Sequence, residues 1–282
     1  MGIFDVFVAF VQGIVEGITE WLPVSSTGHM ILVNEFLKFH GNEEFNKMFI
    51  VVIQLGAILA VALLFWKKLW PFHLNNNEEK GPVIKWDIMS MWLKIIVACI
   101  PAAIVGILFD DFIDAHFYNP PVVAAMLIIY GVLFIVVEIW HKGKKATTTS
   151  IADITYKDVL LIGLFQLLAA IFPGTSRSGA TILGALLLGI SRPVAAEFTF
   201  FLAVPVMFGA SLLKIGKYAM TGLGFGPMEL VVLLTGCLVA FIVSLFVIKF
   251  LMNYIRKHDF KIFGYYRIVL GILVLFYFFV IK

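Results

Sequence analysis

Four candidate side chains for acid–base or nucleophilic chemistry lie in one stretch, 16–30 (EGITEWLPVSSTGHM), of an otherwise apolar chain. They are Glu16, Glu20, Ser26 and His29. A hydroxyl three residues from an imidazole is within reach of a base that can activate it as a nucleophile. The carboxylates can orient the histidine or hold a divalent cation against a phosphate. These residue types together predict a catalytic site.

A second polar stretch, 173–181 (PGTSRSGAT), supplies the cationic group that an anionic substrate needs. Arg177 lies there among the hydroxyls of Ser176, Ser178 and Thr181. A guanidinium, neighbouring hydroxyls and the backbone N–H groups at a helix start form a cradle for an anion, best matched by phosphate. Combined with the nucleophile and base of the first stretch, this cradle predicts phosphoryl transfer.

The chain around these two stretches has the composition of a membrane protein. Of its 282 residues 61% are hydrophobic and 14% are charged, and the mean hydropathy is +1.01. Soluble domains carry about 25% charged residues. A charge at the bilayer centre costs at least about 2.5–3.5 kcal/mol, so the charges inside apolar segments are functional candidates. The basic residues are dispersed between apolar runs and the net charge is only +3, which argues against a nucleic-acid partner.

Six segments are long and apolar enough to cross the hydrocarbon core as helices, which takes about 20 residues. These predicted spans are 49–66, 88–109, 121–140, 194–213, 228–251 and 262–281. Two further apolar stretches, 3–32 and 159–190, are interrupted by polar residues and proline. They are predicted to form re-entrant helical hairpins, which a bilayer tolerates only where the broken backbone lines a cavity or packs on protein. The expected fold is an all-α integral membrane protein with six transmembrane helices and two re-entrant hairpins.

The distribution of lysine and arginine predicts the orientation of these spans, because cytoplasmic loops are enriched in both. With the N-terminus outside, the inside loops carry 12 basic residues and the outside segments carry 5. The outside loop 110–120 has three aspartates and no basic residue. Both termini are therefore expected outside.

The two interrupted stretches also resemble each other in sequence. Residues 13–28 align with 163–179 at an offset of 150, which pairs two glycines, two prolines, and a glutamate with Gln166. Three spans follow each stretch, and because three is odd the second copy must be inverted. We expect one membrane domain built from a first repeat, 1–140, and a second, inverted repeat, 151–282. Inverted repeats with broken helices place the ligand site where the repeats meet.

The alignment assigns counterparts to the two hydroxyl-bearing turns. Ser25 and Ser26 are paired with Thr175 and Ser176, and Arg177 is treated as one inserted residue. The inversion of the repeat then predicts that both turns converge on one site.

Local signals predict how the first turn is built. The first helix is expected to end near Leu22, because the proline that follows is disfavoured in a helix interior. The hydroxyls of the turn, Ser25 and Thr27 among them, can cap a second helix that begins near His29.

The first helix of this hairpin carries two further patterns. Gln12, Glu16 and Glu20 recur every four residues and so share one face. Gly13 and Gly17 form a GxxxG motif, which lets another helix backbone approach closely.

The segments QGIVEGITEWLPVSSTGHM (12–30) and PGTSRSGAT (173–181) together resemble the undecaprenyl-diphosphate phosphatase family, also known as bacitracin-resistance proteins. The resemblance extends over essentially the whole chain in length, number of spans and repeat. It implies an enzyme of the bacterial plasma membrane that hydrolyses undecaprenyl diphosphate on the extracytoplasmic side. The product, undecaprenyl phosphate, is the lipid carrier for peptidoglycan synthesis.

The same resemblance implies roles for single residues. It makes Ser26 the nucleophile, His29 the acid–base group and Arg177 the phosphate-binding cation. Glu16 and Glu20 form the glutamate motif and are the candidate ligands of a divalent cation, Ca²⁺ or Mg²⁺. The hydroxyls and amides expected to contact the phosphates are Ser25, Thr27, Ser176, Ser178, Thr181, Gln12 and Gln166. Whether a serine or a water attacks phosphorus, and whether the glutamates bind metal, stay open.

Two other classes of function fit parts of the sequence. A lipid-phosphate transporter or flippase would use the same architecture, arginine and hydroxyls, but it would not need a Ser/His pair beside two glutamates. A membrane scaffold would leave the clustered ionisable residues unexplained. The expected partners are a polyprenyl diphosphate lipid and membrane lipids, and the glycine-rich helices permit a homodimer without requiring one.

Overall fold

The computed structural model describes residues 1–40, 42–72 and 83–282. Within these ranges the structure is helical apart from turns and two isolated β-bridges. The helices in chain order are α1 (Ile3–Thr19), α2 (Ser26–Phe36), α3 (Glu43–Val52), α4 (Gln54–Leu64), α5 (Trp66–Leu69), α6 (Trp86–Phe117), α7 (Pro120–Trp140), α8 (Tyr156–Ile171), α9 (Arg177–Leu187), α10 (Arg192–Met220), α11 (Pro227–Ile255), α12 (Lys261–Phe276) and the π-helical η1 (Tyr277–Ile281).

Six helical segments are long and apolar enough to cross a membrane. They are Glu43–Leu64, which joins α3 and α4, then α6, α7, α10 and α11, and finally Lys261–Ile281, which joins α12 and η1. Each of them overlaps one of the six predicted spans. The prediction of an all-helical chain with six spans is therefore confirmed for the residues that the structure describes.

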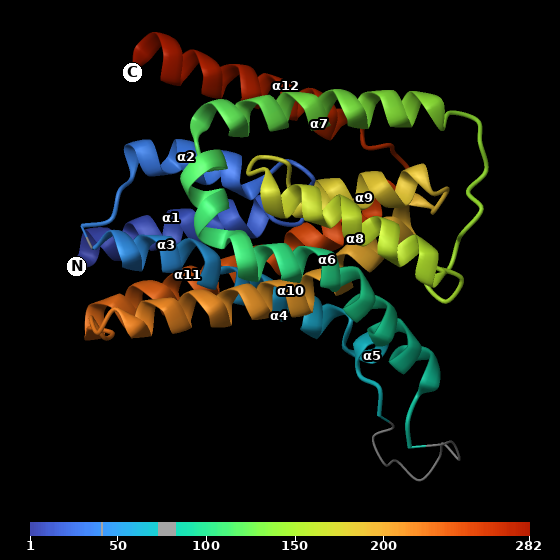
Figure 1. The fold of residues 1–282 in the computed structure, drawn as a ribbon, viewed down its shortest axis with the longest axis horizontal. Coiled ribbons are helices and arrows are strands. Elements are labelled where there is room, and N and C mark those ends of the chain that lie inside the picture. Colours follow the sequence, from blue (N-terminus) through green and yellow to red (C-terminus); the bar gives the residue numbers. More distant parts are fainter. Residues whose placement is uncertain (41, 73–82) are drawn as a thin grey trace.

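Each of the two interrupted stretches forms a pair of shorter helices joined by a turn. In Figure 1, α1 and α2 lie in the left half of the molecule, α8 and α9 lie in the right half, and the two turns meet between them. α1 packs against α11, α8 packs against α6, and α7 and α12 pack along each other beside α2 and α9. The site built from the two turns is therefore enclosed by the long helices.

Glycines allow α1 to lie directly on α11, as the GxxxG motif predicted. A Cβ on Gly13 would lie 2.8 Å from the carbonyl oxygen of Gly236, and a Cβ on Gly17 would lie 2.9 Å from that of Ala240. A Cβ on Gly163 of α8 would likewise lie 2.5 Å from a backbone oxygen of α6. Any side chain at these three positions would separate the helices.

Both chain termini lie at the same end of the helix bundle (Figure 1). The C-terminal ends of α2, α6 and α10 lie at that end too, whereas those of α5, α7 and α9 lie at the opposite end. We call the end that carries the termini the terminal end. Because α2 runs from the turn towards this end, its last residues lie farther from the site than its first.

Candidate active site

The two short helices α2 and α9 begin with the same backbone geometry. Ser25 precedes α2 with φ of 72°, and Ser176 precedes α9 with φ of 70°. Each serine side chain accepts a hydrogen bond from a backbone N–H three residues later, from Gly28 at 3.3 Å and from Gly179 at 3.1 Å. A positive φ costs a non-glycine residue about 1–3 kcal/mol, and such strain concentrates at functional sites. The capping hydroxyls hold both turns in this strained form.

This shared geometry corrects the predicted alignment of the turns. Ser25 corresponds to Ser176, so that Ser26 corresponds to Arg177 and no residue is inserted at Arg177. The sequence supports this alignment, because residues 25–28 and 176–179 both follow the pattern Ser-x-Thr/Ser-Gly without a gap. The predicted nucleophile and the predicted phosphate-binding arginine are thus the first residues of two helices whose starts share one backbone geometry.

The predicted helix ends at the first turn are wrong by three residues. α1 ends at Thr19 rather than near Leu22, and α2 begins at Ser26 rather than near His29. The residue before a proline avoids the helical region, and here the N–H of Val24 donates to the carbonyl of Leu22 at 2.7 Å. The tight turn that results leaves room for the second helix to start earlier.

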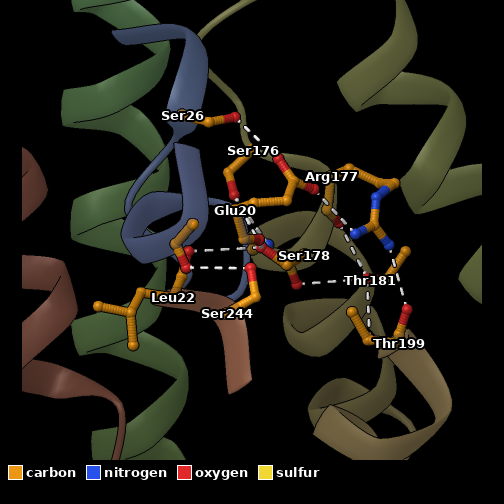
Figure 2. Close-up of polar contacts among 11 residues, drawn as sticks. Glu20, Leu22, Ser26, Ser176, Arg177, Ser178, Thr181, Thr199 and Ser244 are labelled. Atoms are coloured by element: carbon orange, nitrogen blue, oxygen red, sulfur yellow. Dashed lines mark hydrogen bonds and ion pairs between the residues drawn. The ribbon is translucent and has the colours of Figure 1, made fainter. Parts of the chain in front are cut away.

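Glu20 connects the two turns through its carboxylate. One oxygen accepts a hydrogen bond from Nη2 of Arg177 at 3.0 Å, and the other accepts one from Oγ of Ser26 at 2.9 Å (Figure 2). Nη1 of Arg177 donates to the carbonyl oxygen of Thr199 at 3.1 Å. The nucleophile and the arginine that the sequence predicted are therefore bound to one carboxylate, although 151 positions separate them in the chain.

Further hydroxyls hold the second turn against the first. Oγ of Ser178 donates to the backbone oxygen of Glu20 at 3.0 Å. Oγ1 of Thr181 lies 2.9 Å from Oγ1 of Thr199 and donates to the backbone oxygen of Arg177 at 2.9 Å. Ser178 and Thr181, like Ser25, thus support the turns.

A cavity of about 140 Å³ lies beside the Glu20 carboxylate. Polar side chains on its wall are Glu20, Ser26, Thr27, Gln54, Ser176 and Arg177. Its apolar side includes Val206, Met207 and Ala210 of α10. A wall that is charged on one side and apolar on the other suits a substrate with an anionic head and a hydrocarbon chain. We call this space the catalytic cavity.

Of the predicted phosphate contacts, Thr27 and Ser176 line the catalytic cavity, whereas Ser25, Ser178, Thr181 and the two glutamines do not. Nε2 of Gln12 donates to Oδ1 of Asn34 at 2.6 Å, and Nε2 of Gln166 is 3.5 Å from the carbonyl oxygen of Ala98. Both glutamine side chains are buried, and their amide oxygens have no hydrogen-bond partner among the described residues.

The histidine is placed differently from the prediction. Nδ1 of His29 lies 2.7 Å from the carbonyl oxygen of Ser25, and Nε2 lies 2.7 Å from the hydroxyl of Tyr266, whose ring stacks on the imidazole. Among the described contacts the proton acceptor of the Ser26 hydroxyl is Glu20 rather than His29. The acid–base role of His29 stays a prediction.

Glu16 is the remaining ionisable group of the first stretch. It is 1% exposed, and its Oε1 has no hydrogen-bond partner in the described part of the chain. A buried carboxylate oxygen without a partner is costly, and a cation would satisfy it. No three Asp, Glu, His or Cys side chains of the described residues gather as a metal site. Glu16 and Glu20 are therefore the two carboxylates of this stretch that would hold a divalent cation such as Ca²⁺ or Mg²⁺, which prefer oxygen ligands.

The sequence patterns did not single out Arg267, which lies fully buried in α12. Its guanidinium donates to the carbonyl oxygens of Pro23 at 3.2 Å and of Gly174 and Thr175 at 2.9 Å each. Arg267 therefore links the backbones of the two turns through hydrogen bonds. The sequence did contain a signal for a functional or structural role, because Arg267 is the one basic residue inside the predicted span 262–281.

Replacing Arg267 by methionine is expected to destabilise the protein by about 3 kcal/mol, because buried carbonyl oxygens lose their donors. The measurement is the midpoint of thermal unfolding of the purified protein in detergent. Arg256→Met is the matched control, since Arg256 is exposed at the end of α11. Equal midpoints for the two variants would contradict the bracing role of Arg267.

The sequence matches the family model described as "Bacitracin resistance protein BacA" over residues 9–273, which include both turns and Arg267. The chain belongs to the BacA family. With six helices that can cross a membrane, the family identifies a multi-pass membrane protein.

Similar members of the family extend over nearly the whole chain. An undecaprenyl-diphosphatase of Desulfitobacterium hafniense is 60% identical over 278 residues, which cover 99% of this chain and 98% of that protein. An undecaprenyl-diphosphatase of Enterococcus faecalis is 62% identical over 263 residues, 93% of each chain. Undecaprenyl-diphosphatase 1 of Clostridium acetobutylicum is 61% identical over 277 residues, 98% of each.

Proposed function

We propose that this protein hydrolyses undecaprenyl diphosphate to undecaprenyl phosphate and inorganic phosphate. The observation that carries the proposal is the contact of Ser26 and Arg177 with the Glu20 carboxylate beside a cavity. A hydroxyl, a proton acceptor and a guanidinium are the parts that phosphoryl transfer requires. The chain is also about 60% identical to proteins named undecaprenyl-diphosphatase. The activity returns the lipid carrier to peptidoglycan synthesis and fits the family's link to bacitracin resistance.

The shape of the catalytic cavity supports a lipid diphosphate as substrate. The terminal phosphate binds Arg177 and the N–H groups at the starts of α2 and α9, where helix dipoles favour an anion. The hydrocarbon chain leaves along the apolar side formed by Val206, Met207 and Ala210. Binding of the head is therefore electrostatic, and binding of the chain is hydrophobic.

The proposed reaction has two steps. Oγ of Ser26 attacks the terminal phosphorus while its proton passes to Glu20, and the bond from phosphorus to the bridging oxygen breaks, so that its electron pair leaves with undecaprenyl phosphate. Water then attacks the phosphoserine, Ser26 regains a proton, and inorganic phosphate is released. Arg177 stabilises the phosphoryl charge in both steps. Direct attack by water gives the same products without phosphoserine.

Phosphate release from undecaprenyl diphosphate tests the function directly. The purified protein in detergent is expected to release one inorganic phosphate per substrate molecule. Detergent removes the two sides of the membrane, so a lipid-phosphate flippase without hydrolytic activity would release none. Absence of release under these conditions would exclude the proposed activity.

Glu16 and Glu20 are proposed to hold a divalent cation together with the diphosphate oxygens. When bound, such a cation polarises phosphoryl oxygens and neutralises developing charge. A chelator is expected to lower the rate of phosphate release at least about tenfold, with recovery on adding Ca²⁺ or Mg²⁺. A rate that is the same with and without the chelator would contradict the metal requirement but not the phosphatase activity.

We also propose that the chain is an inverted repeat with two re-entrant hairpins, α1–α2 and α8–α9. The packing supports this, because the first helix of each hairpin lies on the second long helix of the other half, α1 on α11 and α8 on α6. The matching caps at Ser25 and Ser176 support it further. In the bacterial plasma membrane the terminal end then faces outside, since the loops predicted at the opposite end are richer in lysine and arginine.

A further inference from the structure

A second cavity, of about 230 Å³, lies between α2 and α3. It is lined by Asn34, Lys38, Phe39, Asn46 and Ile50. None of these residues lines the catalytic cavity. Nothing in the proposed reaction therefore accounts for the polar groups gathered here.

The second cavity lies in line with the catalytic cavity along three helical segments. On each segment one polar residue belongs to the catalytic site, and another lies eight positions away at or beside the second cavity. These pairs are Gln12 of α1 and Glu20 at its C-terminal cap, Ser26 and Asn34 on α2, and Gln54 and Asn46 on α3–α4. Eight residues of helix correspond to about 12 Å. The second cavity is thus about two turns from the first, on the side of the terminal end, towards which α2 runs (Figure 1).

The chemistry of the second cavity combines donors with an unpaired acceptor. Lys38 brings an ammonium group, and it is exposed, so this side reaches solvent. Oδ1 of Asn34 accepts a hydrogen bond from Gln12, so the NH₂ group of Asn34 is a donor. Oδ1 of Asn46 is buried and has no partner among the described residues. A ligand that satisfies all three groups needs anionic oxygens and one O–H.

Inorganic phosphate has this combination near neutral pH, because it carries negative oxygens and keeps at least one P–OH group. Sulfate has the same size and charge but no O–H, so it leaves the acceptor of Asn46 unpaired. Phosphate is also the product that the catalytic cavity must discharge. The lipid product, by contrast, can return to the bilayer along the apolar side of the catalytic cavity.

We propose that the second cavity is a binding site for inorganic phosphate, occupied by the product on its way to the terminal end. The source of the phosphate rests on the proposed function, but the binding itself does not. A lipid phosphate headgroup would offer similar oxygens. The exposed ammonium at one side and the buried amide at the other favour the free ion, which needs no path for a hydrocarbon chain.

Equilibrium binding of inorganic phosphate tests this site in the full-length protein in detergent. Arg177→Ala serves as background, because it weakens phosphate binding in the catalytic cavity. This variant is expected to bind one phosphate, and adding Lys38→Met or Asn46→Leu is expected to weaken binding at least about tenfold, or 1.4 kcal/mol. Lys47→Met is the matched control, since Lys47 is an exposed lysine of α3 that pairs with Glu43.

Product inhibition gives a second measurement that does not depend on the Arg177 background. Added phosphate is expected to raise KM through the catalytic cavity and to lower kcat through the second cavity. Lys38→Met and Asn46→Leu should keep the effect on KM and lose the effect on kcat. If the chain did not hydrolyse the diphosphate at all, the binding measurement would still decide the proposal.

Three outcomes would overturn the proposal. One is phosphate affinity in the Arg177→Ala background that neither Lys38→Met nor Asn46→Leu changes. Another is sulfate binding as tight as phosphate binding, which would show that the Asn46 acceptor is not used. The last is displacement of phosphate by a water-soluble, short-chain phosphatidate at lower concentration than by phosphate itself, which would assign the cavity to a lipid headgroup.

Discussion

Ser26→Ala is expected to lower kcat for phosphate release about 10⁴-fold, or about 5.5 kcal/mol in the barrier. The change removes the hydroxyl oxygen that the proposed reaction converts to a phosphoserine, while keeping the cavity nearly the same size. The hydroxyl is already oriented, because its Oγ donates to the Glu20 carboxylate at 2.9 Å. KM should change little, since Arg177 still binds the phosphate.

The matched control for this prediction is Ser244→Ala. Ser244 is a buried serine of α11 whose Oγ lies 3.5 Å from the carbonyl oxygen of Gly17, outside the catalytic cavity. Its loss should change kcat less than about threefold, as expected for one weak hydrogen bond. Acid quenching of the wild type during turnover should yield phosphoserine in the peptide that contains Ser26. If Ser26→Ala kept a tenth of the activity and no phosphoserine formed, water would be the attacking group.

The membrane architecture could be predicted because span length and apolar composition are properties of single segments. About 20 apolar residues must form a helix in lipid whatever surrounds them, so all six spans were visible in the sequence. The close contact of Gly13 and Gly17 with another helix could be predicted for a similar reason, since a helix face without side chains favours close helix packing. Such features need no knowledge of the rest of the chain.

The contacts inside the site could be predicted only in part, because a shared helix face does not fix depth along the axis. Gln12 of α1 and Glu20, which caps the end of α1, share one face, yet eight residues, or about 12 Å, separate them. The predicted phosphate contact of Gln12 assumed that residues on one helix face also lie at the same position along the helix axis. The structure instead bonds Gln12 to Asn34.

Partners on distant helices were also beyond the reach of sequence patterns. His29 and Ser26 are three residues apart, which suggested a pair, but the imidazole turns to Tyr266 on α12. Arg267, the next residue of α12, binds carbonyl oxygens rather than carboxylates. Backbone acceptors are present at every residue, so no residue type in the sequence marks them as partners.

Arg177→Ala is expected to lower kcat/KM about 10³-fold, or about 4 kcal/mol. Two losses add up in this variant. The phosphate loses its guanidinium, and Glu20, which is 6% exposed, is left without the cation that pairs with it at 3.0 Å. Arg177→Lys should recover only part of the activity, because an ammonium cannot bind Glu20, the backbone of Thr199 and a phosphate with the planar fork of arginine.

The matched control is the ion pair of Arg192 with the buried Glu138, in which Nε of Arg192 donates to Oε1 of Glu138 at 2.9 Å and the arginine side chain is 36% exposed. Arg192→Ala also removes an arginine from a buried carboxylate, but neither residue lines the catalytic cavity. It should lower thermal stability and leave kcat/KM of the folded protein within about threefold of wild type. Both variants remove an arginine from a buried carboxylate, but only the Arg177 variant also loses transition-state stabilisation. A similar fall in kcat/KM for both would mean that the effect of Arg177 comes from folding rather than from phosphate binding.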